Sequence, residues 1–444
     1  MNYTYRYLAK IVLEADSPFN ISTGRDNLET QSPAIRDING LPYLPSSSIA
    51  GVLRHAIGEE TAKTFFGSLE TDAGSRIIFT DAVMIGKNGT ALDGIKDIDF
   101  NDSFYRHFNK LPIRHHVRIN EKGAGADKGK YDHEIVYKGT RFVFEIVMYS
   151  DGTDQKQFEE VIEKLQDSNF ALGGKTRRGL GRMKVVKCEK AILDLKKEKD
   201  LNDYLNKSAS LEESFSRYED ITTESTNPTG WTKYEMTLIP EDYFLFRAGE
   251  SDDNRNAIPT TEAYIRWDDN QKPSFVEGCV ILPGSSIKGA IAHRTAYHWN
   301  RIKQNYAERP LHIVGERNPA ISTIFGYVDG DKAKRGNCLI PDIIEEMPLT
   351  NSDKKIFNHV AIDRVTGGAS QTALFSEQAV YRKGMAYSLI ILVKDEALSN
   401  ETIREAFECA LKDITNGSLP LGGLTNRGYG IFSGTIKKNE EVII

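Results

Sequence analysis

The segment "LGGKTRRGLGRMKV", from Leu172 to Val185, has a counterpart near the other end of the chain, "LGGLTNRGYGIFSG", from Leu421 to Gly434. Within these segments, "GGKTRRGLG" and "GGLTNRGYG" agree at six of nine positions: four glycines, one threonine and one arginine. Gly173 matches Gly422, so the two copies stand 249 residues apart. Such a long internal period indicates that one structural unit is written twice.

The residues before each glycine segment extend the match. Two sets of apolar residues share this offset and the i, i+3, i+4, i+7 spacing of a helix face: Phe158, Val161, Ile162 and Leu165, then Phe407, Ala410, Leu411 and Ile414. The strand-like runs "RMKVVKC" and "IFSGTI" follow the glycine segments. Each glycine segment is therefore predicted to join a helix to a strand.

Four further pairs of segments occur in the same order in both halves. They are "LPSSSIAGVLRHAI" from Leu44 with "LPGSSIKGAIAHRTA" from Leu282, "RIIFTDA" around Asp81 with "NCLIPDI" around Asp342, "HVRIN" from His116 with "HVAID" from His359, and "VYKGTRFVFEI" from Val136 with "VYRKGMAYSLII" from Val380. The serine clusters are predicted to cap a helix, and a long irregular insertion follows in each half.

This layout fits an elaborated β-α-β-β-α-β unit. The predicted fold class is α+β, with two tandem ferredoxin-like (RRM-like) domains, each carrying a glycine-rich loop and an insertion. We place the domains at residues 1–192 and 230–444. A polar linker at 193–229 is predicted to hold one helix near Leu201 to Ser216.

Composition limits the classes of function. The 444 residues carry a formal net charge of −6, so any surface for nucleic acid must be a local basic patch. The four cysteines are too far apart in sequence for a CxxC pair, which argues against zinc and against a disulfide framework. The N-terminus has no apolar signal core and the chain no membrane-length apolar run, so we expect no membrane association and a reduced, cytoplasmic location.

Several of these motifs together resemble a known family. "LPYLPSSSIAGVLR", "LPGSSIKGAI", "SPAIRD" at Ser32 to Asp37 and the "GGxTxRGxG" loops are similar to the RAMP superfamily, the repeat-associated mysterious proteins of CRISPR systems. The nearest likeness is to backbone subunits of type III effector complexes, here as two fused copies. The resemblance implies a subunit that holds the CRISPR guide RNA in a basic groove and presents it to complementary target RNA. It also implies other type III subunits as partners, and identifies the insertions as thumbs that interrupt the guide–target duplex.

The glycine loops are the first candidates for RNA contact. Glycine lets the backbone approach phosphates, and clustered N–H groups can bind an anion. Six basic residues and no acidic one stand between Gly173 and Cys188. The loop candidates are Gly173, Gly174, Lys175, Arg177, Arg178, Arg182, Gly422, Gly423, Asn426 and Arg427. The alternative is a glycine-rich turn with a solvated basic face.

The serine-led helices and the insertions give the other candidates. Helix N-termini attract phosphates, so the helices contribute Ser46, Ser47, Ser48, Arg54, Ser285, Ser286 and Lys288. The insertions contribute Arg114, His116, Arg118, His359 and Arg364. The alternatives are plain helix capping for the serines and a mobile surface loop for the insertions.

Cleavage of target RNA is a separate question. In cleaving relatives an aspartate precedes the "SPxIRD"-like stretch, whereas Gln31 and Thr261 stand at those positions here. Nearby carboxylates at Asp26, or at Asp252 and Asp253, are the candidates to support Mg²⁺-dependent cleavage. The alternative is that these carboxylates are simply solvated.

Two other functions fit parts of the pattern. A CRISPR repeat-processing endoribonuclease also pairs two ferredoxin-like units, and His55 and His293 occupy matching positions in the serine-led helices. A purely structural protein would pack its two domains against partners without binding RNA. Co-purification of RNA, and cutting of repeat RNA by the isolated chain, distinguish the three functions.

Overall fold

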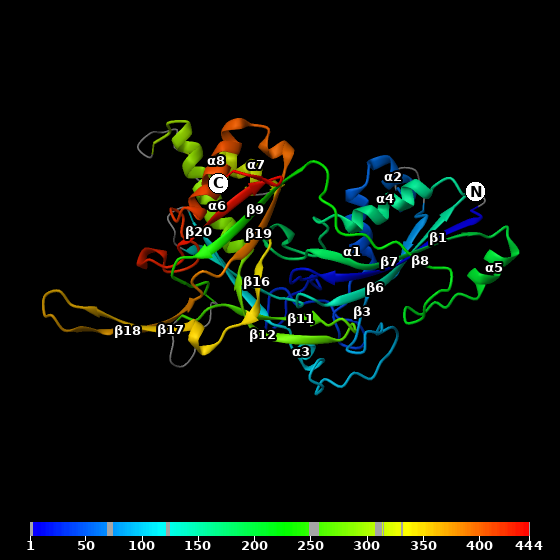
Figure 1. Ribbon diagram of the computed structural model, residues 1–444, viewed down its shortest axis with the longest axis horizontal. Coiled ribbons are helices and arrows are strands. Elements are labelled where there is room, and N and C mark those ends of the chain that lie inside the picture. The colour runs from blue at the N-terminus through cyan, green and yellow to red at the C-terminus, as the bar shows by residue number, and fades with distance from the viewer. Residues whose placement is uncertain are drawn as a thin grey trace.

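The computed structural model contains two similar α+β halves in tandem, which lie side by side in Figure 1. It describes residues 3–68, 74–120, 125–247, 257–306, 313, 315–329 and 332–443. The predicted fold class is confirmed, because each half has the strand and helix order of a ferredoxin-like unit.

The first half is built on a sheet with the strand order β2-β6-β1-β7-β8, in which neighbours are antiparallel and β3 also pairs with β6. Helices α1 and α4 pack on one face, where their apolar residues share a core with Tyr7, Ala9 and Ile11 of β1. The elements are β1 (Tyr5–Ala15), α1 (Ser46–Ala56), α2 (Glu59–Phe66), β2 (Ile77–Phe79), β3 (Val83–Met84), α3 (Arg106–Asn109), β4 (Ile113–Ile119), β5 (Gly125–Glu134), β6 (Arg141–Ser150), α4 (Gln155–Gln166), the short 3₁₀ helix η1 (Thr176–Arg178) and β7 (Met183–Asp194).

The second half repeats this arrangement with the sheet order β15-β19-β9-β20-β21 and with α6 and α8 in the places of α1 and α4. Its main elements are β9 (Trp231–Pro240), β10 (Tyr243–Phe244), β11 (Thr261–Trp267), β12 (Pro273–Leu282), α6 (Gly284–Ile302), α7 (Pro319–Ile324), β13 (Gly326–Asp329), β14 (Lys332–Arg335), β15 (Cys338–Leu339), β16 (Ile343–Pro348), β17 (Lys354–Ile362), β18 (Ala369–Tyr381), β19 (Tyr387–Lys394), α8 (Glu401–Thr415), η5 (Thr425–Arg427), β20 (Phe432–Lys438) and β21 (Glu441–Val442). Three further 3₁₀ turns are η2 (Gly315–Arg317), η3 (Asn351–Asp353) and η4 (Asp395–Leu398).

The helices before the glycine loops are confirmed. All four apolar residues predicted for each helix are buried in α4 and α8. The prediction that serines cap the other two helices is wrong. The N-caps are Pro45 and Pro283, without a side-chain hydrogen bond. Each helix N-terminus is instead capped by an aspartate carboxylate from the strand region that follows the helix. Asp81 Oδ1 accepts from the Ser46 N–H at 2.7 Å, and Asp342 Oδ1 accepts from the Gly284 N–H at 2.6 Å.

The insertions predicted to be irregular are regular antiparallel hairpins, β4–β5 and β17–β18, which we call the thumb hairpins. The second projects well beyond the body of the molecule (Figure 1). Their glycines and polar residues are typical of loops, which concealed the alternation of apolar residues such as Val117 and Ile119. A hairpin whose two faces are both largely solvated gives only a weak strand signal.

Residues 198–221, which we call the strap, lie against the sheet face opposite the first half's helices. The strap contains α5 (Glu198–Leu205) and β8 (Glu219–Asp220), and β8 pairs with β7. Tyr204, Phe215 and Tyr218 pack on Leu8 and Leu193 of the sheet. The linker thus contains a helix, but at Glu198–Leu205 and not over the predicted range to Ser216, whose later part is irregular. The predicted domain boundaries stay predictions.

The two halves pack closely together through the β11–β12 hairpin, which lies on the core of the first half. The Ile265 N–H donates to Lys138 O at 2.8 Å, and Trp267 Nε1 donates to Gly139 O at 2.7 Å. Phe275 stacks on His107 with ring centroids 3.8 Å apart. All four cysteines are free thiols. Among the described residues, no helix is both long and apolar enough to cross a membrane.

Candidate nucleic-acid interface

The two glycine loops have the same backbone conformation, so the repeat extends to single dihedral angles. Lys175 and Leu424, which differ in side chain, both have φ of 59°. Gly179 and Gly428 have φ of 99° and 88°, a region that L-residues rarely adopt. A Cβ atom at Gly181 would overlap the carbonyl oxygen of Leu172, which shows that this glycine allows the loop to close on its own chain.

Several of the N–H groups expected to cradle a phosphate are already used inside the protein. The Gly174 N–H donates to Asn20 O at 2.9 Å, and the Gly181 N–H donates to Pro18 O at 2.8 Å. In the second loop, the Gly423 N–H donates to Leu245 O at 2.7 Å. These glycines fix the shape of the loop, and the loop then positions its basic side chains.

An open groove of about 1090 Å³ runs between the two halves. Its walls come from the first thumb hairpin, both glycine loops, the start of α6 and the β13–β14 hairpin. Among the RNA candidates, those that line it are Arg114, His116, Arg118, Arg177, Arg178, Ser285, Ser286, Lys288, Gly422 and Gly423. Candidates far apart in sequence therefore meet in one groove.

Four cations meet at the junction of the halves, and we call Arg177, Arg178, Lys288 and Arg335 the junction cluster. Among the described residues, none of the four forms an ion pair with a carboxylate. Burial and the nearby Arg335 lower the pKa of Arg177 to about 10, and burial together with Arg178 and Arg177 lowers the pKa of Lys288. The sequence reasoning missed Arg335, although the basic run "KAKR" was a signal.

Each thumb hairpin forms a stack with the arginine of its glycine loop. In the first half, His116 stacks on Tyr131 at 5.0 Å, and Arg178 lies 5.8 Å from the Tyr131 ring and donates to its hydroxyl at 2.8 Å. In the second half, His359 stacks on Phe375 at 4.9 Å, and Arg427 lies 4.7 Å from that ring. We call these the first and second stacks.

The two stacks differ in charge because of one position. His133 stands two residues after Tyr131, whereas Glu377 stands two residues after Phe375. Glu377 is buried and pairs with both His359, at 2.9 Å, and Arg427, at 3.3 Å. The first stack therefore keeps the positive charge of Arg178, while Glu377 neutralises that of Arg427 in the second.

Arg114 is a correction to the predicted set. It is buried, its Nε donates to Glu262 Oε1 at 2.8 Å, and its Nη1 donates to Asp342 Oδ2 at 2.5 Å. Asp342 also caps α6, so the base of the first thumb hairpin is tied to the second half. Because its charge is used inside the protein, Arg114 is removed from the side chains expected to reach RNA. Glu262 lies in the same ion-pair cluster.

One family model finds the same duplication in the sequence. A model of the RAMP superfamily matches residues 12–184 and 260–433, which is most of the chain. The chain belongs to the RAMP superfamily. Its two halves are thus two RAMP units in one chain, which implies a CRISPR-associated RNA-binding protein. A comparison with curated proteins finds no match.

The remaining candidates of the two RAMP units lie outside the residues that line the groove. Arg54 donates to Phe66 O and Gly67 O, and Arg182 pairs with Asp16, so both serve the fold of the first unit. Lys175 lies 5.1 Å from the Tyr131 ring, beside the first stack. The others are Gly173, Gly174, Ser46, Ser47, Ser48, Asn426, Arg427, His359 and Arg364, with Arg364 exposed at the turn of the second thumb hairpin.

The structure adds little evidence for the predicted catalytic carboxylates. Asp26 is exposed in a loop of the first RAMP unit that is held to the thumb hairpin, since Thr30 Oγ1 donates to Asp132 at 2.7 Å and the Ala34 N–H to Glu134 at 2.7 Å. Asp252 and Asp253 lie outside the described residues. Within the described part of the chain, no three His, Cys, Asp or Glu side chains are grouped to hold a metal ion.

The histidines of the processing-enzyme alternative are separated. His293 lies in the groove, whereas His55 is exposed on α1 of the first RAMP unit and is not part of the groove lining. The repeat thus places the two matched histidines in different surroundings. That arrangement does not favour a shared catalytic role.

The shielded histidines of the first stack, the half-buried His116 and the buried His133, predict a pH-dependent stability. Burial and the cations of Arg114, Lys175 and Arg178 lower the pKa of His116 to about 3, and that of His133, which is fully buried, to about 2. Both folded-state values lie below the unfolded value of about 6.5, so the unfolded chain binds protons first as pH falls. Each histidine should lower the free energy of unfolding by roughly 2 kcal/mol between pH 7 and pH 5.

The measurement is denaturant unfolding at both pH values for the wild type and for His133→Phe. The variant should lose a large part of the pH effect. Replacing the exposed His55 by glutamine should leave it unchanged. A wild-type protein equally stable at pH 5 and pH 7 contradicts this reading of the first stack.

Proposed function

We propose that this protein is a guide-RNA-binding backbone subunit of a type III CRISPR effector complex, which presents the guide to complementary target RNA. The observation that carries the proposal is the junction cluster in the groove, which both RAMP units build and which has no carboxylate partner in the described part of the chain. Four nearby cations in a chain of net charge −6 repel one another. The phosphates of an RNA strand would relieve that repulsion.

This kind of contact suits a guide of any sequence. Arginine and lysine side chains bind phosphates without reading bases, so they fix the position of the strand and not its sequence. The junction cluster joins the loop of the first unit to α6 and β14 of the second, so one strand would cross from unit to unit. The aromatic rings of the two stacks offer surfaces on which bases can stack.

The two units are expected to hold RNA unequally. In the first unit, Arg178 and Lys175 both lie by Tyr131 and keep their charge for a phosphate. In the second, Arg427 must leave Glu377 before it can bind one. The first unit would therefore contribute more of the affinity and of its salt dependence.

The decisive experiment is to purify the chain in its native complex and to extract and sequence the RNA. The proposal expects RNAs that each join a CRISPR repeat fragment to a spacer, released as salt rises. Absence of RNA contradicts it. Cutting of repeat RNA by the isolated chain would instead favour the processing endoribonuclease.

Target cleavage is a further part of the proposal, with Asp26, Asp252 and Asp253 as its carboxylates and Mg²⁺ as its ion. Mg²⁺ takes oxygen ligands and usually keeps several waters, so one or two carboxylates and RNA phosphates are a sufficient set. The Asp26 loop is tied to the first thumb hairpin, where the target strand would be interrupted.

We expect replacement of Asp26, Asp252 and Asp253 by alanine to lower the cleavage rate at least tenfold. The assay is complementary, end-labelled RNA incubated with the assembled complex and magnesium. Asp97→Ala, which removes an exposed carboxylate of the first unit, serves as the control. Unchanged cleavage by the triple variant would assign the activity to other residues or subunits.

A further inference from the structure

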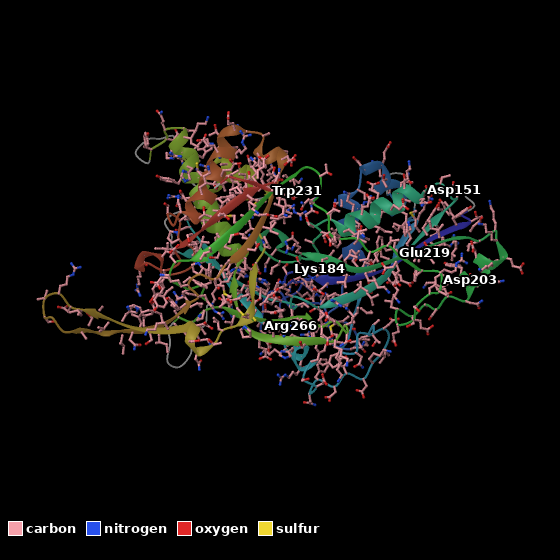
Figure 2. The ribbon with its side chains drawn as sticks, viewed as in Figure 1. Asp151, Lys184, Asp203, Glu219, Trp231 and Arg266 are labelled. Carbon is pink, nitrogen blue, oxygen red and sulfur yellow. The ribbon has the colours of Figure 1, made fainter. Side chains whose placement is uncertain are left out.

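The two RAMP units contact each other head to tail, with the glycine loop of the first on the sheet of the second. Leu180 and Gly179 of the loop face Ile340, Ile390 and Leu392 around a small shared cavity. Arg177 lies 5.2 Å from the ring of Trp231, which Figure 2 marks at the start of β9. A Cβ at Gly179 would overlap the Asp342 carboxylate, so the fit tolerates only glycine there.

The second glycine loop has the same backbone shape, but no described residue packs on its Gly428. Gly428 is the counterpart of Gly179, and no described atom lies within 4 Å of a Cβ built there. Asn426, the counterpart of Arg177, is exposed, and Ile431 next to the loop leaves 38% of its surface in solvent. A backbone conformation that glycine alone adopts easily is therefore kept where no neighbour requires it.

The first unit's sheet, by contrast, is already covered by the strap. Ile78 pairs with Val147 as its counterpart Leu339 pairs with Leu392, so Val147 corresponds to Leu392 and Glu145 to Ile390. Glu145 accepts from Lys207 and Tyr218 of the strap at 2.7 and 3.0 Å. Val147 packs in the cluster that includes strap residues Tyr204 and Phe215.

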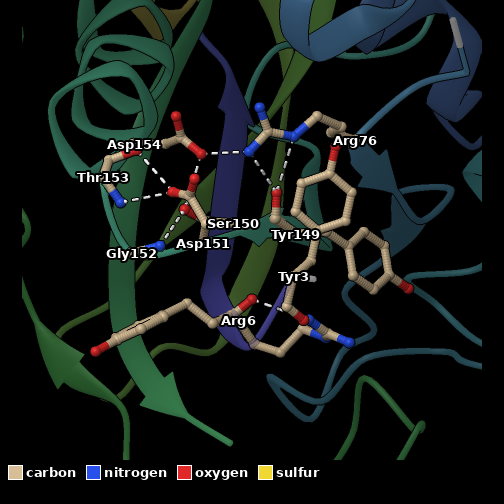
Figure 3. Close-up of polar contacts among 10 residues, drawn as sticks. Tyr3, Arg6, Arg76, Tyr149, Ser150, Asp151, Gly152, Thr153 and Asp154 are labelled. Atoms are coloured by element: carbon tan, nitrogen blue, oxygen red, sulfur yellow. Dashed lines mark hydrogen bonds and ion pairs between the residues drawn. The ribbon is translucent and has the colours of Figure 1, made fainter. Parts of the chain in front are cut away.

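The next position along this strand is closed in the same way. Arg6 lies 4.3 Å from the Tyr149 ring, beside the polar contacts drawn in Figure 3, and 5.6 Å from the Tyr204 ring of the strap. In this register Arg6 corresponds to Trp231, which Arg177 of the first glycine loop contacts in the second unit. Helix α5 of the strap lies at the end of the molecule away from the second unit (Figure 1).

We propose that the chain extends the array of units in one direction only. Its second glycine loop, the open end, docks on the sheet of a third ferredoxin-like unit. The sheet of its first unit, the closed end, is already covered by the strap. This proposal rests on the proposed function, since it extends the array that would hold the guide. A head-to-tail contact joins two different surfaces, so units can keep adding until one of them has no free surface. Here the strap covers that surface.

The third unit belongs to a different protein chain. In the described part of a second copy, neither ferredoxin-like sheet has its outer face free, because the strap covers one and the copy's own first glycine loop covers the other. The partner sheet needs an apolar outer face like that of Ile390 and Leu392. It also needs room for Ile431, which replaces Arg182 in the second loop, whereas Tyr429, in the place of Leu180, is buried against Tyr243 and Phe357 of its own unit.

Site-specific photocrosslinking in the native complex tests the direction of docking. A benzoylphenylalanine at Ser418, the counterpart of the cavity-lining Asn169, probes the open end. One at Ile78, the counterpart of Leu339, probes the closed end. We expect position 418 to crosslink to the sheet strands of a ferredoxin-like unit in another chain, and position 78 to none.

Other outcomes overturn the proposal: a crosslink from 418 to a second copy or to a surface other than a sheet, no crosslink from 418, or a sheet crosslink from 78. RNA in the same preparation separates the two proposals. Guide RNA without the 418 crosslink overturns the docking alone, and absence of RNA overturns the proposed function.

A pair of charge variants gives an independent readout. Ile431→Glu should lower the recovered partner at least tenfold with an unchanged melting temperature, while Ile78→Glu should recover it fully. Equal recovery with both variants, or loss only with Ile78→Glu, contradicts the proposed direction.

Discussion

Replacing Arg177, Arg178 and Lys288 together by alanine is expected to weaken RNA binding on the order of a hundredfold. The three side chains belong to the junction cluster, face the groove and have no carboxylate among the described residues to pair with. Each lost phosphate contact costs roughly 1 kcal/mol or more at moderate salt. Fluorescence anisotropy with a labelled single-stranded RNA at several salt concentrations measures the change.

The salt dependence makes this prediction specific. Three fewer phosphate contacts should reduce the slope of log K against log salt by about 2 for a single strand. The triple variant Lys184→Ala, Lys187→Ala and Lys190→Ala is the matched control. It removes the same amount of charge, from the strand that follows the first glycine loop, but these lysines pair with Glu14, Glu189 and Glu159. Equal losses in both variants would mean that overall charge, and not the junction cluster, binds RNA.

Replacing Arg114 by methionine is expected to destabilise the protein by about 3–5 kcal/mol, because it leaves two buried carboxylates without their cation. Glu262 and Asp342 are both almost fully shielded, and burial raises the pKa of each carboxyl group. The ion pairs join the two RAMP units, so the loss should also loosen the first thumb hairpin. Denaturant unfolding at pH 7 measures the change.

Two further variants test the cause of that loss. Adding Glu262→Gln to Arg114→Met removes one of the uncompensated charges and should recover part of the stability. Arg364→Ala removes an exposed arginine and should change the free energy of unfolding by less than about 0.5 kcal/mol. A fully stable Arg114→Met protein would show that the carboxylates take up protons or water without cost.

The repeat and its fold were predictable because they depend on local patterns. The apolar spacing before each glycine loop predicted α4 and α8, and the order of matched segments predicted two ferredoxin-like units. The serine caps and the irregular insertions were wrong for a common reason. A cap supplied by Asp81 or Asp342 comes from a distant segment, and a solvated hairpin is stabilised by cross-strand pairs that no single strand displays.

The sequence predicted the types of residue in the candidate site better than it predicted where the fold places them. Arg177, Arg178 and Lys288 were identified from basic character near glycine and serine motifs, and the fold brings them into one groove. Arg114, Arg54 and Arg182 have the same basic character, yet they serve ion pairs or carbonyl groups of the protein. The sequence shows that a residue is basic, but it does not show whether the fold places a carboxylate beside it.

The sequence by itself determined the duplication, the secondary structure around each glycine loop and the local excess of positive charge. Only the tertiary structure decided which cations stay unpaired, that Glu377 neutralises the second stack, and that the strap closes one sheet while the second loop stays open. The physical reason is the distance along the chain over which each interaction acts. Helix periodicity and glycine conformation act between near neighbours, whereas ion pairing, burial and docking depend on residues that meet only after the chain has folded.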